Sequence, residues 1–157
     1  MPAKTDSGEK LIASNKKALH DYFIIQKFEA GLMLTGTEVK SLRDGKAQLK
    51  DAYVIFKDDE AFLFGAHISP YSHGNLQNHE PDRTRKLLLH RREIDKLKVQ
   101  TTEKGLSVVP LRLYFKGSRV KAEIAVVRGK KQYDKRETEK KREADRETAS
   151  AIKQHRG

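Results

Sequence analysis

Hydrophobic and polar residues alternate with a period of two in the middle of the chain, which is typical of strands that bury one face. The apolar residues 53–56 and the alternating residues 61–68 are separated by the polar residues 57–60, so this pattern predicts a hairpin. A second hairpin is predicted at Gly117-Ser118, because glycine in the first position of a two-residue loop suits a type II′ turn. Its strands place large apolar side chains at alternate positions, Leu111, Leu113 and Phe115 before the turn and Val120, Ala122, Ile124 and Val126 after it.

Shorter patterns predict the remaining elements. Strands are expected at residues 22–25 and 37–42, and short helices at 26–34 and 91–98, the second with Ile94 and Leu97 facing inward. Several short strands joined by tight turns, with few helices, favour a small closed β-barrel. Within residues 61–68, the expected faces are Phe62, Phe64, Ala66 and Ile68 on one side and Leu63 and His67 on the other.

The chain divides into three segments by composition. Residues 1–15 are small, polar and charged and are expected to form a flexible leader, whereas residues 16–128 hold nearly all the large apolar side chains. Residues 129–157 contain ten Lys or Arg against six Asp or Glu, and are too polar to bury a core. They are rich in helix-forming residues, but isolated helices of this length are marginal in water. We therefore expect one barrel domain at 16–128 and a basic tail that is disordered alone and helical when bound.

Charge narrows the classes of partner. The 157 residues carry a formal net charge of +11, from 33 Lys or Arg and 22 Asp or Glu. Such a chain attracts polyanions, of which nucleic acid is the first candidate and an anionic membrane surface the second. The absence of cysteine excludes disulfides, thiol catalysis and zinc ribbons, and suits a reducing cytosol. Neither a signal peptide nor a membrane-spanning run is recognisable, so we expect a cytoplasmic monomer without a membrane partner.

The densest basic run of the middle segment is Arg83-Thr84-Arg85-Lys86. Guanidinium groups grip phosphate with two hydrogen bonds and stack on exposed bases, so this run predicts contact with RNA. The alternative is a solvated charged stretch beside an ordinary core strand. Lys40, Arg43 and Lys46 form a second basic cluster, for which a solvated turn is an equally good interpretation. Because an OB-like barrel is the most frequent small barrel among RNA-binding proteins, analogy makes it the expected fold, mainly β with short flanking helices.

No residue pattern points to catalysis or to metal binding. Glu29 and Glu38 are lone acids in apolar or basic surroundings. Such a carboxylate can accept hydrogen bonds from a guanine edge or a 2′-hydroxyl, or can form an ion pair that holds a Lys or Arg. His67, His73 and His79 match no metal-ligand spacing, so we interpret them as surface or hydrogen-bonding residues. Motifs of nucleophilic enzymes, phosphate-binding loops and metalloproteases are absent from the sequence, and we expect neither an enzyme nor a cofactor.

Four stretches of the chain resemble the SmpB family, the protein partners of transfer-messenger RNA. The similar stretches lie at residues 15–32, 36–46, 83–90 and 129–136, in the family's order and without a large insertion. The most specific of them are Arg83-Thr84-Arg85-Lys86-Leu87-Leu88-Leu89-His90 and Gly129-Lys130-Lys131-Gln132-Tyr133-Asp134-Lys135-Arg136. Some family members carry His where this chain has Tyr133, which favours base stacking over charge as the role of this position.

The resemblance implies an OB-like barrel that binds the tRNA-like domain of transfer-messenger RNA. With elongation factor Tu and GTP, such a protein delivers this RNA to ribosomes stalled without a stop codon, in trans-translation. Its tail would lie as a helix in the empty messenger channel, against small-subunit RNA. By position, the RNA-binding face would include Glu29, Leu88 and His90, with Arg83, Arg85 and Lys86 beside them. The residues at the decoding centre and channel would be Gly129, Lys130, Lys131, Tyr133, Asp134, Lys135 and Arg136.

Three other functions stay open on the sequence. A general OB-type translation protein or RNA chaperone would bind structured RNA without one preferred partner. A structural ribosome-associated protein would use the basic tail as an anchor. A nuclease is the third, although the sequence offers no acid cluster to hold a catalytic metal.

Overall fold

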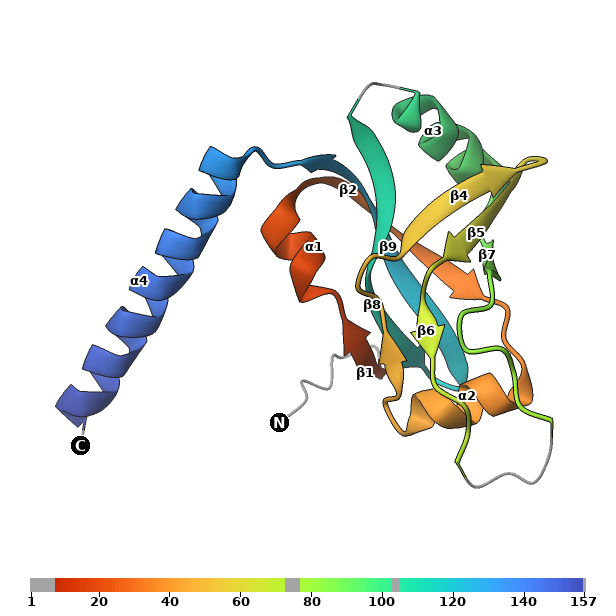
Figure 1. Cartoon of the computed structure of the whole chain (residues 1–157), viewed down its shortest axis with the longest axis horizontal. Helices are drawn as coiled ribbons and strands as arrows, with labels where there is room; N and C mark the ends of the chain where they lie inside the picture. Colours follow the sequence, from red (N-terminus) through yellow and green to blue (C-terminus); the bar gives the residue numbers. More distant parts are fainter. Residues whose placement is uncertain (1–7, 73–76, 103–104, 157) are drawn as a thin grey trace.

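The structure is a computed structural model that describes residues 8–72, 77–102 and 105–156, with the backbone alone for residues 132, 133 and 147–156 (Figure 1). The described helices are α1 (Lys16–Asp21), α2 (Gly36–Arg43), α3 (Arg91–Thr101) and α4 (Gln132–Arg156). The described strands are β1 (Glu9–Ser14), β2 (Tyr22–Leu32), β3 (Ala47–Gln48), β4 (Tyr53–Lys57), β5 (Glu60–Phe64), β6 (His67–Ile68), β7 (Arg85–Leu88), β8 (Leu106–Lys116) and β9 (Arg119–Gly129). Seven of these strands form one antiparallel sheet with the order β1-β8-β9-β2-β7-β5-β4, while β3 pairs with β6. The expected mainly β fold is confirmed.

Both predicted hairpins are present. Gly117 has a φ of +61°, and the pairing of Lys116 with Arg119 closes the β8–β9 turn around it. In the β4–β5 turn, Asp58 and Asp59 have φ values of +52° and +62°. Two consecutive residues with positive φ are the mark of a type I′ turn, and aspartate tolerates this conformation better than most residues.

The concave side of the sheet buries the main core. Leu63, Leu113 and Ile124 are fully buried there, and Leu42 of α2 and Leu97 of α3 join the same cluster. A smaller cluster lies under α1, where Ala18 packs with residues of β8 and β9 such as Leu111 and Val127. Leu111 and Leu113 were expected on one face, but the register shifts between Pro110 and Arg112 and sends them to different clusters.

The expectation of a closed barrel is wrong for the described residues. β4 and β1 are the two edges of the sheet, and no ladder joins them or joins β4 to β8. The sheet nevertheless curls until β4 packs against β8 (Figure 1). A groove of about 480 Å³, lined among others by Asn15, Tyr53 and Val108, lies where a closing ladder would run.

Two predicted elements have the opposite secondary structure. Residues 26–34 were expected to be helical, but residues as far as Leu32 belong to β2, because pairing with β9 along its whole length outweighs the local pattern. Residues 37–42 were expected to be a strand and instead lie in α2. Thr35 and Glu38 form a capping box that starts this helix, since the Thr35 hydroxyl accepts from the Glu38 backbone and the Glu38 carboxylate accepts from the Thr35 backbone. The predicted helix at 91–98 is confirmed as α3, with Ile94 and Leu97 buried.

The expectation of one shared face for Phe62, Phe64, Ala66 and Ile68 is wrong, because the alternation changes phase at Gly65. Ala61 and Leu63 point into the core, whereas Phe64 is 43% exposed. Gly65 has a φ of +84°, which ends β5, and after it Ala66 and Ile68 are buried.

Both ends of the chain carry regular secondary structure. Residues 9–14 were placed in a flexible leader, but they form β1, which pairs with the outer edge of β8; residues 1–7 of that leader lie outside the described residues. The tail forms one helix, α4, which projects from the body beside α1 (Figure 1). Contacts with α1 join its first turns to the body, and a tail that is disordered alone stays a prediction. No helix in the described part of the chain is long and apolar enough to cross a membrane.

Candidate nucleic-acid interface

A groove of about 820 Å³ runs across β2, β7, the start of α3 and the β8–β9 turn. It is lined by four of the residues expected to bind RNA, namely Glu29, Lys86, Leu88 and His90. These residues come from two separate parts of the sequence, residue 29 and residues 86–90, and the sheet brings them together. The groove is therefore the candidate interface.

Strand β7 supplies the floor of this groove. Side chains alternate across a strand, so Arg85 and Leu87 point into the core while Lys86 and Leu88 point out. Leu88 pairs with Gly31 of β2 and is 51% exposed. A Cβ atom on Gly31 would lie 3.2 Å from the Cβ of Leu88, so the absence of a side chain at Gly31 makes room for the leucine.

Glu29 presents a fixed negative charge at the side of the groove. Its Oε2 accepts a 2.5 Å hydrogen bond from the Tyr114 hydroxyl, and Lys116 Nζ lies 3.3 Å from Oε1. The Tyr114 hydrogen bond, with help from Lys116, holds the pKa of Glu29 below its usual value. Burial and the Glu29 carboxylate together raise the pKa of Tyr114, which keeps its hydroxyl protonated as a donor. Glu29 is thus an ionised acceptor with room for a further donor.

Cations border the groove on both sides. Lys86 forms a salt bridge of 3.1 Å with Glu60, whereas Arg119 and Lys121 form no salt bridge with any described residue. Arg119 follows the β8–β9 turn, and Lys121 pairs with Gly31 in the ladder of β2 and β9. These two residues were not among those expected to bind RNA. The alternation of buried Val120 and Ala122 around Lys121 was the signal that could have assigned its side chain to the outer face.

His90 stands at the mouth of the groove, where α3 begins. Its backbone N–H donates to the Glu93 carboxylate at 3.0 Å, which fixes the start of the helix, and its side chain is exposed. The exposed imidazole can therefore contact a bound molecule.

Arg85 is not available to RNA, contrary to expectation. Its side chain is 0% exposed, and its guanidinium donates to Glu38 Oε2 and to the carbonyls of Ala66, Glu80 and Pro81. Arg83 donates to the other oxygen of Glu38 at 2.6 Å and is only partly exposed. Of the two interpretations of Glu38, the ion pair is thus confirmed.

Burial alone would raise the pKa of Glu38. Hydrogen bonds from Arg83, from the Thr35 backbone and from Arg85 outweigh that effect and hold the pKa below its usual value. The pair of Glu38 and Arg85 joins α2 to β7 in the interior, so part of the basic run stabilises the fold.

Lys40, Arg43 and Lys46 do not line the groove. They are exposed on α2 and in the turn that follows it, and Lys40 Nζ lies 5.6 Å from the centre of the Tyr71 ring. RNA contact by this cluster stays a prediction.

Two of the three spaced histidines make hydrogen bonds, as expected. His79 is buried and bonds to Thr37 Oγ1 at 2.9 Å and to the Ile68 carbonyl at 2.8 Å, while His67 bonds to Asp82 at 2.8 Å. His73 lies outside the described residues. In the part of the chain that the structure describes, no three His, Asp or Glu side chains are grouped as a metal site requires.

The root of the tail is fastened to α1. The Lys130 backbone donates to the Asp21 carbonyl at 2.7 Å, and Lys130 Nζ donates to Thr138 Oγ1 of α4 at 2.6 Å. Lys135 lies 3.5 Å from the Asp21 carboxylate, and Lys131 donates through its backbone to Asp134 at 3.3 Å. Gly129 ends the ladder with β2, and Arg136 is exposed. The side chain of Tyr133 lies outside the described residues.

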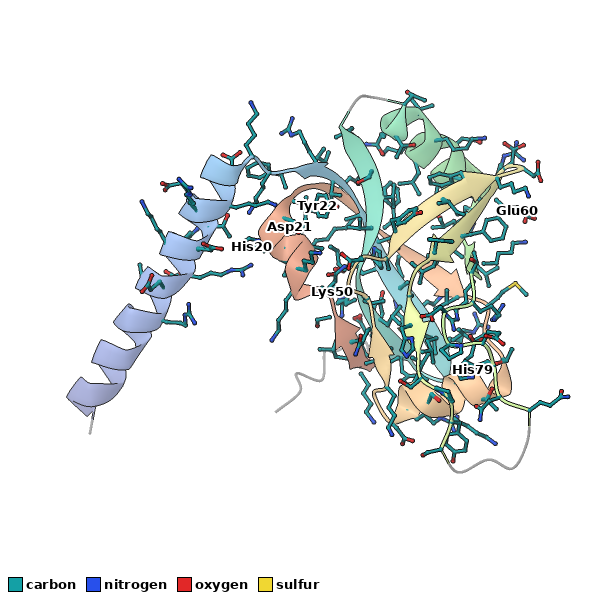
Figure 2. All side chains as sticks on the ribbon, viewed as in Figure 1. His20, Asp21, Tyr22, Lys50, Glu60 and His79 are labelled. Carbon is teal, nitrogen blue, oxygen red and sulfur yellow. The ribbon has the colours of Figure 1, made fainter. Side chains whose placement is uncertain are left out.

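His20 joins the two helices directly (Figure 2). Its Nδ1 atom lies 2.8 Å from Asp21 Oδ1 and its Nε2 atom 2.6 Å from Glu139 Oε1. Hydrogen bonds to Asp21 and to Glu139 raise the pKa of His20 above its ordinary value of 6.5. We call the contacts of His20 with Asp21 and Glu139 the clasp. His20 of the clasp and Glu60 of the groove lie on opposite sides of the molecule (Figure 2).

Comparison with known proteins agrees with this geometry. The sequence model of the family described as SmpB protein matches residues 12–154. The SsrA-binding protein of Pelobacter propionicus is 60% identical over 146 residues, which cover 93% of this chain and 96% of that protein. The SsrA-binding proteins of Geobacter sulfurreducens and Oleidesulfovibrio alaskensis are 57% and 54% identical, over 94% and 99% of this chain and 96% and 100% of theirs.

A solved structure has the same fold. It is described as "tmRNA-SmpB: a journey to the center of the bacterial ribosome", and the matched chain is 41% identical with a TM-score of 0.66. The match covers 80% of this chain and 92% of the other. With a family match over most of its length and relatives near 60% identity, the chain belongs to the SmpB family.

Proposed function

We propose that this protein binds the tRNA-like domain of transfer-messenger RNA and delivers that RNA to stalled ribosomes for trans-translation. The observation that carries the proposal is the groove that joins Glu29, Lys86, Leu88 and His90. The names of the relatives, which refer to SsrA, and of the solved structure, which refers to tmRNA and the ribosome, supply the identity of the RNA.

Each side chain of the groove has a role in this proposal. Lys86, Arg119 and Lys121 attract the phosphate backbone and set the position of the RNA. The ionised Glu29 accepts a hydrogen bond from a guanine edge or a 2′-hydroxyl, which single-stranded RNA loops expose. Leu88 packs against a base or ribose, and His90 adds a hydrogen bond. The OB-like platform thus reads an RNA elbow by shape and backbone, with few base contacts.

The tail is proposed to act on the ribosome. A helix as polar as α4 fits a channel lined by RNA, and the residues at its root, from Gly129 to Arg136, would meet the decoding centre. An occupied messenger channel would exclude this helix, so that the tail senses missing messenger. Elongation factor Tu with GTP is the proposed carrier of the delivery complex, and the cytoplasm is the proposed location.

A binding titration tests the proposal. The full chain is titrated against the tRNA-like domain at about 150 mM salt, with bulk tRNA and a plain hairpin as competitors, because affinity for RNA depends steeply on salt. Tight binding that survives both competitors is the expected result. Equal and weak binding to all three RNAs would overturn the proposal and favour a general binder of structured RNA.

A further inference from the structure

An apolar surface continues from the candidate groove across the outer face of β5 and β4. Tyr53 pairs with Phe64, and Ile55 with Phe62, in the ladder of β4 and β5. Val54 and Leu63, which alternate with them, are buried, so these four side chains point outward. We call Tyr53, Ile55, Phe62 and Phe64 the aromatic face.

The two rings farthest from the groove are open to solvent. Tyr53 and Phe64 are each 43% exposed, with ring centres 5.2 Å apart and planes inclined by 46°. A burial-driven sheet would place these large rings inward and small polar residues outward. Here Ala61 and Leu63 face the core instead, which leaves the rings of Tyr53 and Phe64 exposed.

The aromatic face is continuous with the groove. Phe62 pairs with Lys86, which lines the groove, and the Met33 backbone donates to the Lys86 carbonyl at 3.0 Å. Met33 is also exposed, so a further apolar side chain lies beside this strand. β4 lies two strands from β7, a separation of about 10 Å. One RNA loop can therefore reach the groove and the rings together.

Charge favours RNA as the occupant. The cations Lys57 and Lys86 lie on the same outer face, and its one acid among the described residues of β4, β5 and β7, Glu60, is neutralised by Lys86. Exposed rings beside cations on a β-sheet are the arrangement that single-stranded nucleic acid uses for stacking. An RNA strand can use the rings through its bases and the cations through its phosphates.

We infer that the aromatic face is a stacking platform for an unpaired nucleobase of the RNA held in the groove, with Tyr53 and Phe64 as the stacking residues. The inference rests on the proposed function, and deepens it by adding base contacts to a site that otherwise grips the backbone. It predicts that the bound RNA has an unpaired nucleotide about 10 Å from the groove.

The test compares ring-removing variants with matched controls in titrations of the tRNA-like domain over a salt series. Tyr53→Leu and Phe64→Leu remove a ring and keep apolar bulk, so each is expected to weaken binding by about 5- to 150-fold. The slope of log affinity against log salt should stay unchanged, because no cation is lost. Tyr53→Phe keeps the ring and should lose less affinity than Tyr53→Leu. Val99→Ala trims an apolar side chain that is 70% exposed on α3, and should also have no effect.

Lys86→Gln distinguishes the proposed groove contact with phosphate from the inferred stacking on the aromatic face. It should reduce both affinity and the salt slope, the latter by about 0.7–0.9 for one phosphate contact. If Lys86→Gln weakens binding while both leucine variants match Val99→Ala, the stacking inference is wrong and the groove proposal stands. If leucine variants bind RNA normally but lose association with ribosomes, the face meets a ribosomal protein and the inference is also wrong. A natural chain with no preference for the tRNA-like domain would overturn the proposed function itself.

Discussion

The imidazole of His20 in α1 lies 2.6 Å from the carboxylate of Glu139 in α4, although the two residues are 119 positions apart in the chain. The same imidazole lies 2.8 Å from Asp21, which also faces Lys135 of α4. The tail helix is therefore held to the body through one titratable ring between two acids. In this state Lys135, expected at the decoding centre, already has an intramolecular partner.

Docking of the tail should depend on pH. The pKa of His20 is raised above 6.5 by Asp21 and Glu139, so the charged clasp is complete below 6.5 and is lost as pH rises through the raised pKa. A pair of fluorophores on α1 and on the distal part of α4 should report a longer separation as pH rises from 6.5 through the raised pKa.

The control for this clasp is the neighbouring exposed acid Glu137. Glu139→Gln should lower the pKa of His20 in an NMR titration and lengthen the separation at low pH, whereas Glu137→Gln should do neither. Identical behaviour of the two variants would mean that His20 does not hold the tail.

The buried acid Glu38 should be essential for stability. Glu38→Gln leaves the guanidinium of Arg85 buried without a counter-charge, and should lower the free energy of unfolding by roughly 3–5 kcal/mol. Glu60→Gln breaks the half-exposed pair with Lys86 and should change it by only about 0–1 kcal/mol. Urea denaturation of both variants measures the difference, and equal losses would contradict the structural role of Glu38.

The same residue predicts a response to acid. The pKa of Glu38 lies below its ordinary value of 4.5, so its stabilisation is present above that value and is lost as pH falls through the lower pKa. The free energies of unfolding of the natural chain and of Glu38→Gln, measured by urea denaturation, should therefore converge as pH falls.

Glu29 provides a test in which the sign of the effect decides the mechanism. As an ionised acceptor it should add affinity for the tRNA-like domain, so Glu29→Gln should weaken binding about tenfold or more, the value of a charged hydrogen bond. If Glu29 only repelled phosphate, the same variant would bind more tightly. Asp44→Asn, which removes an exposed carboxylate after α2, is the matched control and should leave affinity for the domain nearly unchanged.

Deletion of residues 133–157 should separate binding from rescue. The groove and the clasped tail lie on opposite sides of the molecule, so the shortened chain should bind the tRNA-like domain with near-natural affinity. In a reconstituted translation reaction on a message without a stop codon, the shortened chain should not support trans-translation. No incomplete protein that carries the added tag should then be released. Loss of RNA binding together with rescue would contradict the two-part division.

Local signals predicted the hairpins and α3, because Gly117-Ser118 and the spacing of Ile94 and Leu97 act over a few residues. The sequence also carried the capping box at Thr35 and Glu38, which was overlooked in favour of a strand. The helix expected at 26–34 failed for a different reason. β2 owes its extended form to β9, which lies about a hundred residues later, and no local pattern reports that pairing.

In the candidate site, too, features set by nearby residues were predictable and features set by distant pairing were not. Glu29, Lys86, Leu88 and His90 were placed on one face through family resemblance, and the structure puts all four around one groove. Arg85 was misplaced because its partner Glu38 is 47 positions away, although alternation with buried Leu87 already put it on the inner face. Arg119 and Lys121 were missed because their proximity to the groove depends on a register that the sequence does not state.

The pairing of early strands with late ones has a consequence for synthesis of the protein. β1 and β2 emerge from the ribosome first, yet their partners β8 and β9 are made last. Contacts so distant along the chain make folding slow and leave it incomplete until translation has passed residue 129. A ribosome that stalls earlier on this message yields a fragment whose longest early strand has no β9 to pair with. Such a fragment exposes an unpaired edge, and its own production creates a need for disposal of incomplete chains.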